Sequence, residues 1–493
     1  MAPNIWDNSD ADNDGNNANN WSLGNVPQAG DVATFDNTSD DNCTFSGNIT
    51  CDGLSAEAGY DGNIDFGDSM THAYGASGLV FDHAGDVDMG TGTGHTITDG
   101  PFDYLHVGGT FTSATSTVTL EGVCELVGST NDYLNNLTIA GGATVTDGVG
   151  SGWVGTSGVM TINGSVDLTS QMLRVTTNGT IVLGGSAVVS STLLLWILQS
   201  GAGITSNAGA TVTGTVQVYA PKSGAVIAPG TYSHLLIYLN GTWIASAGSY
   251  TFSSAEFANN SGSVDTVIDL SSNNATVAIN GNLVIDLDNS SDIILDASSN
   301  PLTVQGDIID EITGGGTLVA DGQDLTFTGT NAQDVDLMGA TWGAVVENKP
   351  SETVTLSGAL NCGSFTGTDG DLDCNGQTVV SSGNVDWASG FTLNPGDADS
   401  LNGCSWTVQG NFTCDGQTLN AKSAWSLDVT GSAVASGVGS VQFSDASDGT
   451  EIDASDGPWV DGGNNTNWNF GLVPVGPWDT PWEPAAFAVG AWR

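Results

Sequence analysis

The chain has 493 residues, of which 55 are acidic and only five are Lys or Arg, so its formal net charge is −50 at pH 7. Nucleic acids and anionic lipid surfaces are bound through Lys and Arg, so this charge excludes both as electrostatic partners. Only nine of the acidic residues are Glu, and because Glu, Lys and Arg cover helix surfaces, their scarcity excludes a helical protein.

Residues 1–40 are expected to form an N-terminal cap. The segment Asn20–Pro27 reads Asn-Trp-Ser-Leu-Gly-Asn-Val-Pro, which differs from the repeats that follow. Before it, Asp10, Asp12 and Asp14 have the alternate spacing of carboxylates in a calcium-binding loop. The twelfth position of that loop is Trp21 instead of Glu. The three aspartates are therefore either candidate calcium ligands or part of a solvated acidic loop.

Short apolar–polar alternations along the chain indicate half-buried strands. Thr117–Leu120 and Thr353–Leu356 both alternate Thr with an aliphatic residue, which is the period of a strand with one buried face. Leu193–Leu198 is the longest apolar run and is too short to cross a membrane, so it is predicted to be one buried strand. With 39% hydrophobic residues and 14 Trp, the chain can bury a core and is not disordered.

A glycine repeat runs through residues 41–460. The clearest copies begin at Gly358, Gly370, Gly383, Gly396 and Gly410, spaced roughly 12 to 14 residues apart. This spacing predicts strand–turn–strand units wound into a right-handed parallel β-helix, or β-solenoid, with atypical capping ends. Each coil would hold two units on three sides, or one unit if it is flattened. The alternative all-β fold is a series of tandem β-sandwich domains.

Cysteines and histidines recur with this repeat. Local spacing suggests three disulfides, Cys43–Cys51, Cys362–Cys374 and Cys404–Cys414. Because Cys362, Cys374 and Cys414 occupy the same place in the glycine unit, a ladder of buried free thiols fits equally well. The histidines His72, His83, His95 and His106 lie about half a coil apart, so they either form a ladder that binds a transition metal or are stacked by the repeat without a metal.

Residues 461–493 are expected to form a C-terminal cap followed by a docking tail. The segment Asn467–Pro474 repeats the N-terminal pattern of Trp, Gly and Val-Pro, as a terminal unit that closes an open sheet edge would. The glycine spacing then stops, and Trp478, Trp482, Phe487 and Trp492 are predicted to anchor a partner. The alternative is that this tail folds back as a lid over the last coil.

The segment Asn20–Asp36 resembles the opening motif of bacterial and tailed-phage β-solenoid proteins, in which Asn-Trp-Ser, Val-Pro, Gly-Asp and Phe-Asp precede the first coils. The segment Asp461–Trp468 is similar to their terminus. The resemblance implies a structural virion protein, such as a fibre, spike or decoration protein, or alternatively a secreted bacterial adhesin. It implies as partners other virion or surface proteins, host-surface glycans and further copies of the chain, and it transfers no catalytic residues.

An enzyme is the third alternative, a polysaccharide depolymerase. A lyase needs a cation near the abstracted proton, and the few Lys and Arg residues are scattered; a glycosidase needs two carboxylates, for which the chain offers too many candidates to choose. No catalytic residue and no cofactor other than calcium is therefore expected. Met1–Trp6 has neither the basic nor the apolar region of a secretion signal, which favours the virion over an extracellular or cell-surface location.

Overall fold

A computed structural model shows the chain as a parallel β-solenoid of about 18 turns, with 56% of its residues in strands and 1% in helix. The structure describes residues 3–104, 109–129, 132–148, 152–168, 172–175, 179–191, 194–197, 203–219, 225–238, 242–259, 264–395 and 403–471. The predicted β-solenoid is confirmed and the tandem β-sandwich alternative is wrong. Within these ranges the one antiparallel pairing is the isolated bridge between Trp6 and Trp21.

The chain divides into two compact units, Met1–Gly363 and Ser364–Arg493. In the first unit each coil has three sides. Where the strands are short, a strand typically pairs with the one three places further on, and where one long strand covers two sides the interval is shorter. On one side Leu137 lies opposite Met160 and Met160 opposite Ile181. Residues joined by a side-chain hydrogen bond from one coil to the next lie, for example, 20, 23, 27 and 30 residues apart. The three-sided coil with two glycine units is thus the correct alternative, and the flattened coil is wrong.

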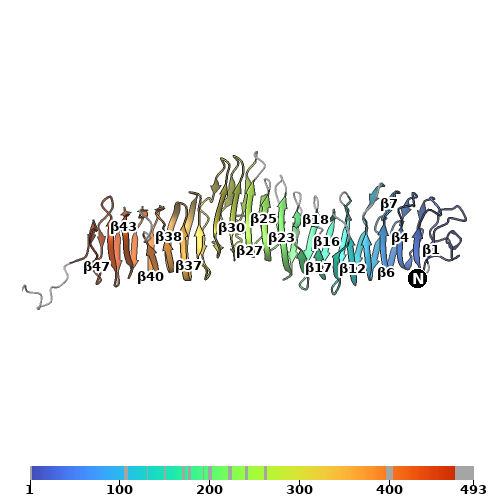
Figure 1. The fold of residues 1–493 in the computed structure, drawn as a ribbon, viewed down its shortest axis with the longest axis horizontal. Coiled ribbons are helices and arrows are strands. Elements are labelled where there is room, and N and C mark those ends of the chain that lie inside the picture. The colour runs from blue at the N-terminus through green and yellow to red at the C-terminus, as the bar shows by residue number, and fades with distance from the viewer. Residues whose placement is uncertain are drawn as a thin grey trace, which may run out of the picture. The chain divides into compact units, whose positions relative to one another are not determined.

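The strands of the first unit lie side by side in three faces (Figure 1). The first face contains β1 (Pro3–Ile5), β2 (Val32–Phe35), β4 (Thr50–Ala56), β6 (Thr71–Phe81), β9 (Gly100–Asp103), β12 (Val123–Val127), β14 (Thr144–Asp147), β17 (Ser165–Leu168), β20 (Val188–Ser191), β23 (Thr211–Tyr219), β25 (Gly230–Tyr238), β27 (Ser249–Asn259), β29 (Thr276–Ile279), β32 (Leu302–Val304), β35 (Leu325–Phe327) and β37 (Thr341–Leu356). The second face contains β8 (Gly94–Ile97), β11 (Thr117–Leu120), β13 (Asn136–Ile139), β16 (Val159–Ile162), β19 (Thr180–Leu183), β22 (Gly203–Asn207), β24 (Ala225–Ile227), β26 (Thr242–Ala245), β28 (Thr266–Asp269), β31 (Ile293–Asp296) and β34 (Leu318–Val319). The third face contains β3 (Cys43–Thr44), β5 (Ile64–Asp65), β7 (Val87–Asp88), β10 (Phe111–Thr112), β15 (Trp153–Thr156), β18 (Met172–Val175), β21 (Leu194–Ile197), β30 (Leu283–Leu287), β33 (Ile308–Ile312) and β36 (Gln333–Val335).

Several long strands bend around a corner and belong to two faces. The first parts of β4 and β6 extend the second face, and the second parts of β23, β25, β27 and β37 extend the third. The predicted strands at Thr117–Leu120 and Thr353–Leu356 are confirmed as β11 and part of β37. The apolar run Leu193–Leu198 likewise contains β21.

The second unit also has three faces. Its strands are β38 (Leu360–Asp373, in this unit from Ser364), β39 (Thr378–Ser381), β40 (Val385–Asn394), β41 (Ser405–Val408), β42 (Phe412–Asp415), β43 (Thr418–Val429), β44 (Ala433–Ser436), β45 (Ser440–Asp445), β46 (Ile452–Asp453), β47 (Val460–Asp461) and β48 (Trp468–Asn469). One face runs β38–β40–β42–β44–β46–β48.

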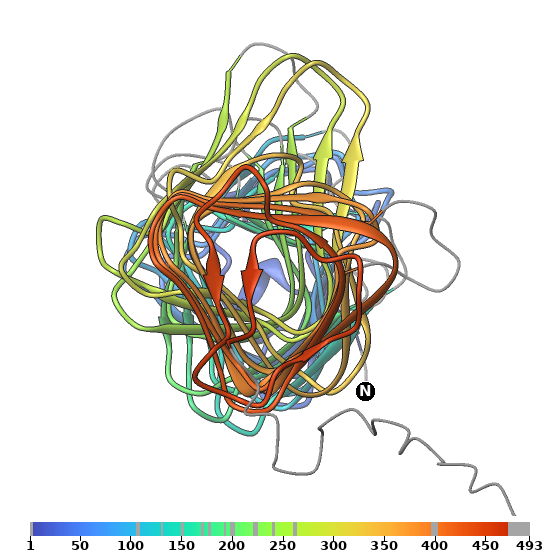
Figure 2. The same ribbon diagram turned by 90° about the vertical axis from the view of Figure 1, so that its left-hand side faces the viewer.

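In each unit the chain winds around a common interior (Figure 2), which is packed with the apolar residues of the alternating strands. In β11, Val118 and Leu120 are fully buried while the two threonines between and before them reach the surface. Burying an aliphatic side chain contributes about 1.5–3 kcal/mol. In the second unit Trp387 and Trp406 meet edge to face, with ring centroids 5.2 Å apart. The same alternation repeats in every coil, so the core is continuous along each unit.

The first 40 residues form the start of the first face. Trp6 and Trp21 are buried against each other, with ring centroids 5.3 Å apart, and both rings contact Phe35. A short 3₁₀ helix, η1 (Ala18–Asn20), precedes Trp21. The expected boundary after residue 40 falls within one sheet, because β2 pairs with both β1 and β4. The tryptophan of the opening motif therefore builds the core of the first coil.

Candidate functional site

The loop that holds Asp10, Asp12 and Asp14 is organised by asparagine side chains. Asn17 Nδ2 donates to Asp10 Oδ2 at 3.0 Å and to Asp12 Oδ2 at 2.8 Å. The Asn19 and Asn17 amides hold the pKa of Asp10 below its usual value, and hydrogen bonds from the Asp14 N–H and the Asn17 amide lower the pKa of Asp12. Both carboxylates are thus kept ionised in a loop that is already fixed by the protein.

Asp14 points to a different neighbour. Its Oδ1 accepts from the Asn16 N–H at 2.9 Å and from the Ser46 hydroxyl at 2.7 Å. Across the described ranges no three His, Cys, Asp or Glu side chains converge as a metal site requires. Calcium binding by Asp10, Asp12 and Asp14 stays a prediction, tested by whether a chelator lowers the melting temperature at fixed ionic strength.

The repeat stacks two of the histidines inside the solenoid. His72 lies opposite His95 in the pairing of β6 with β8, and their rings stack with centroids 5.2 Å apart. Each Nε2 lies 3.0 Å from a backbone carbonyl, of Phe66 and Met89 respectively. His83 is buried against Tyr60, on another side of the coil. This is the arrangement expected of histidines stacked by the repeat, and His106 lies outside the described residues.

All seven cysteines are buried free thiols, and none of the three expected disulfides is formed. Cys43 begins β3 on the third face, whereas Cys51 lies in the second-face part of β4. A disulfide needs Cα atoms about 5.5 Å apart, and residues on different sides of a coil do not meet that condition. The structure therefore supports the free-thiol alternative. Burial raises the pKa of the Cys51 thiol to about 12, which keeps it protonated and unreactive.

The predicted cysteine ladder is also wrong. Cys414 lies opposite Trp387, and Trp387 lies opposite Gly367, so no second cysteine occupies that position in the neighbouring coils. The thiol that Cys374 contacts is Cys404, with which it shares a hydrogen bond. The glycine unit begins on alternate sides of the coil, and this is why equal positions in the unit do not become equal positions in space.

Asparagine and aspartate side chains join each coil to the next along the surface. Asn42 Oδ1 accepts from the Asn63 N–H at 2.9 Å, Asn63 Oδ1 from the Asp86 N–H at 2.9 Å, and Asp86 Oδ1 from the Thr110 N–H at 2.7 Å. We call such a series an Asx column. Further Asx columns run through Asp265–Asp292–Thr317, Asn282–Asp307–Asp334 and Asn384–Asn411–Ser432.

The Asx columns were not predicted from the sequence. They use the side-chain oxygens of Asn and Asp, two residue types in which the chain is rich, as acceptors. At a corner the backbone N–H no longer faces a strand of the neighbouring coil, so at this mostly exposed surface it bonds either to water or to a nearby side chain. A short side chain ending in an oxygen reaches it from the coil before. The signal that would have found them is the recurrence of Asn or Asp at 21 to 27 residues.

An acidic groove lies beside the first Asx column, on the third face of the first unit. Its hollow of about 330 Å³ is lined by Asn63, Ile64, Asp65, Asp86, Val87, Asp88, Thr110 and Thr112. Asp65 lies directly opposite Asp88 in the pairing of β5 with β7. Each carboxylate also accepts a backbone N–H, from Gly67 and Gly90 respectively, at 2.8 and 2.9 Å. The carboxylate oxygens that remain can accept hydrogen bonds from a hydroxyl-rich ligand such as a glycan.

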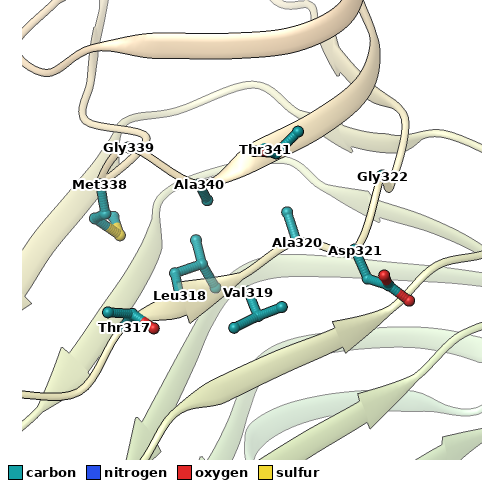
Figure 3. Close-up of a pocket in the computed structure, with 10 residues that line it drawn as sticks. All are labelled: Thr317, Leu318, Val319, Ala320, Asp321, Gly322, Met338, Gly339, Ala340 and Thr341. Carbon is teal, nitrogen blue, oxygen red and sulfur yellow. The ribbon is translucent and has the colours of Figure 1, made fainter.

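A larger pocket of about 510 Å³ lies at the end of the second face (Figure 3). Residues Thr317–Gly322 line one side of it and Met338–Thr341 the other. The next coil is short, with Leu325 opposite Val345 only about 20 residues on. This coil turns sharply at Met338 and Gly339, both of which have positive φ. As a result it places no strand beside β34 on the second face of the described first unit. Leu318, Ala320 and Ala340 contribute apolar side chains to this pocket, beside polar residues such as Thr317 and Asp321.

The few cations differ in their surroundings. Arg174 lies over the ring of Trp153, with its Cζ 4.1 Å from the centroid, and near Tyr133 at 5.4 Å. Lys349 is fully buried.

The predicted docking residues Trp478, Trp482, Phe487 and Trp492 lie outside the described residues. The helix η1, at three residues, is the one helix in the described part of the chain and is too short to cross a bilayer.

Comparison of the chain with protein-family models, with curated proteins and with solved structures gives no match.

Proposed function

We propose that this chain is a non-enzymatic structural protein of a tailed-phage virion, serving as a fibre, spike or decoration protein. The observation that carries the structural role is the Asx column. Each column hydrogen-bonds successive coils from the outside, for example from Asn42 through Asn63 and Asp86 to Thr110. A surface built to hold coils together is suited to a protein that spaces or displays other components.

The virion part of the proposal is supported by the resemblance of Asn20–Asp36 to the opening of phage and bacterial β-solenoid proteins. In this structure Trp21 of that segment is buried and its Nε1 donates to the Gly15 carbonyl at 2.9 Å. The motif thus begins the first coil, as it does in the β-solenoid proteins that it resembles. A secreted bacterial adhesin is the alternative, and the acidic groove would then be its surface for host glycans.

Fractionation of the source culture tests the proposal. We expect the chain to band with purified phage particles in a density gradient and to stay with them after washing at high salt, as measured by peptide mass spectrometry. Antibody labelling in electron micrographs should mark the particle surface. Recovery of the chain only from the surface or medium of uninfected bacteria would overturn the virion assignment in favour of the adhesin.

A separate assay tests the non-enzymatic part. The purified chain, incubated with a panel of bacterial surface polysaccharides, should release neither reducing ends nor unsaturated sugars. Turnover that is lost in an Asp65→Asn, Asp88→Asn double variant would instead identify the acidic groove as the active site of a depolymerase. Heat-denatured chain serves as the blank.

A further inference from the structure

The first unit buries a small group of polar side chains next to its last described third-face strands. Gln333, Glu347 and Lys349 all have no exposed surface. Gln333 begins β36, and the other two lie two residues apart on the inward side of β37. Lys and Glu are rarely buried, because removing a charge from water is costly. In a chain with five cationic residues, this burial calls for an explanation.

The amine and the amide are in direct contact. Lys349 Nζ donates to Gln333 Oε1 at 2.8 Å and to the Asn331 carbonyl at 2.5 Å. On the other side of the amide, Gln333 Nε2 donates to the Gly306 carbonyl at 2.5 Å and to the Val304 carbonyl at 3.3 Å. The two reacting groups are thus held next to each other by backbone carbonyls, in a site without surface exposure.

The surroundings favour a nucleophilic amine. Burial lowers the pKa of Lys349, which increases the neutral fraction of the amine, while the nearby charge of Glu347 acts in the opposite direction. Holding an amine and an acyl group in contact replaces a bimolecular encounter by an intramolecular one, and a positioned carboxyl group can move protons between them. Gln333 has the acyl group that such a step needs. Glu347, buried two residues before Lys349 on the same side of its strand, is near enough for its charge to act on the pKa of the amine.

We propose that Lys349 and Gln333 form an intramolecular isopeptide bond, with Glu347 as the proton carrier. The neutral Nζ attacks Gln333 Cδ, and the new Nζ–Cδ bond forms as the Cδ–Nε2 bond breaks. One proton passes from Nζ through the Glu347 carboxyl group to Nε2, which leaves as ammonia. The atoms balance without an oxidant or a co-reactant, and the product is an amide joining the two side chains.

The cross-link would close a loop between residues 16 positions apart. It would also turn a buried amine that is costly to hold in the core into an uncharged amide. A covalent link of this kind restricts the unfolded chain, so unfolding would leave β36 tethered to β37. This inference concerns the chain's own chemistry and goes beyond the proposed function, and it does not depend on where the chain is displayed.

Peptide mapping of the purified, folded full chain tests the proposal. A protease that cuts before Asp separates Gln333 from Lys349, because Asp334 and Asp336 lie between them. We expect one branched peptide pair whose mass is the sum of the two peptides less one ammonia, and an intact mass lower by the same amount. The unlinked peptides should be recovered from chain kept in denaturant since synthesis.

Three outcomes decide the proposal. Lys349→Arg, checked for folding by circular dichroism, should give only linear peptides, and Glu347→Gln should reduce the linked fraction at least tenfold. Recovery of linear Gln333 and Lys349 peptides from folded, aged wild-type chain would overturn the proposal without needing any variant. Loss of ammonia with both peptides linear would also overturn it, since succinimide formation at Asn–Gly steps such as Asn163–Gly164 gives that mass change.

Discussion

His72 and His95 are buried core residues whose Nε2 atoms contact backbone carbonyls, and His95 Nδ1 also lies 3.4 Å from the Tyr74 hydroxyl. Burial lowers the pKa of His95 to about 3, with a smaller contribution from the charge of His72, while the bond to the Met89 carbonyl opposes the shift. Burial likewise lowers the pKa of His72. Both rings are therefore neutral at physiological pH, and in the coil after His95 the opposite position is taken by the apolar residue Val118.

The His95→Gln variant should show how this stack responds to acid. The folded state favours the neutral ring, so the stability due to His95 is complete above about pH 6.5, the pKa in the unfolded chain, and is lost as the pH falls toward 3. Wild type should lose about 2 kcal/mol relative to the variant between pH 7 and pH 4.5. Urea unfolding at the two pH values measures it.

A control comes from His234, which is half-buried and lies 2.7 Å from the Ser254 hydroxyl. Because its ring still reaches water, His234→Gln should change the pH dependence less than His95→Gln does. An equal effect of the two substitutions, or none for His95→Gln, would contradict a buried neutral ring at position 95.

Neighbouring coils of this solenoid are joined in two ways. Parallel strands pair along the faces, and the Asx columns join the coils at the corners. The columns act where this pairing ends, and each bond joins residues one coil apart. Asn63→Ala removes the acceptor of the Asp86 N–H and should lower the free energy of unfolding by about 0.5–1 kcal/mol. The matched control is Asn37→Ala, an exposed asparagine outside the column. Equal losses for both variants in chemical denaturation would argue against the column.

Glycines at the corners are needed for two separable reasons. Gly90 and Gly92 both have positive φ, 77° and 69°. A Cβ added at Gly90 would lie 1.9 Å from the Gly67 carbonyl oxygen, whereas at Gly92 its nearest neighbour is the Ser69 hydroxyl at 3.8 Å. Gly92→Ala should therefore cost about 1 kcal/mol of backbone strain, and Gly90→Ala more than about 3 kcal/mol because the coils must also separate. Thermal unfolding of the two variants compares them, and similar melting points would contradict this account.

The coil and its strands could be predicted because they depend on local patterns. The alternation in Thr117–Leu120 has the period of a strand whatever its neighbours are, and the glycine spacing gives half a coil. The tertiary partner of a residue depends instead on the number of residues in each coil, which varies along the chain. The cysteine ladder through Cys414 was wrong because successive glycine units begin on different sides of the coil, so that Cys414 lies opposite Trp387.

The candidate site was harder to predict than the fold. The Asx columns need a partner one coil away, and the spacing between partners varies, so Asn42, Asn63 and Asp86 do not stand out from other polar residues. In the sequence, Lys349 is one of several scattered cations. Its inward position follows the alternation with Val345 and Glu347, but charged residues are expected at the surface, and sequence pattern alone does not overrule that expectation.

At the scale of the whole molecule, charge is the dominant electrostatic feature. A formal charge of −50 with five Lys and Arg leaves most carboxylates without a cationic partner. Parallel stacking brings like charges together, as with Asp65 opposite Asp88, at a strand spacing of about 4.8 Å. The repulsion between such pairs acts against folding, and mobile ions reduce it.

The melting temperature should therefore rise with salt. The distance over which charges repel falls from about 30 Å at 10 mM salt to about 3 Å at 1 M, so at 10 mM each carboxylate feels several coils and at seawater salt only its nearest neighbours. We expect the melting temperature to be higher by roughly 5 °C or more in seawater-strength NaCl than in 10 mM NaCl, since about 1 kcal/mol moves it by a few degrees in a large domain. Calorimetry at pH 7 measures the shift. The same comparison near pH 4, where about half of the carboxyl groups are protonated, is the internal control and should show a much smaller shift. A melting temperature that is flat or falls with salt at pH 7, or a shift that is as large at pH 4, would mean that charge repulsion does not limit the stability of this fold.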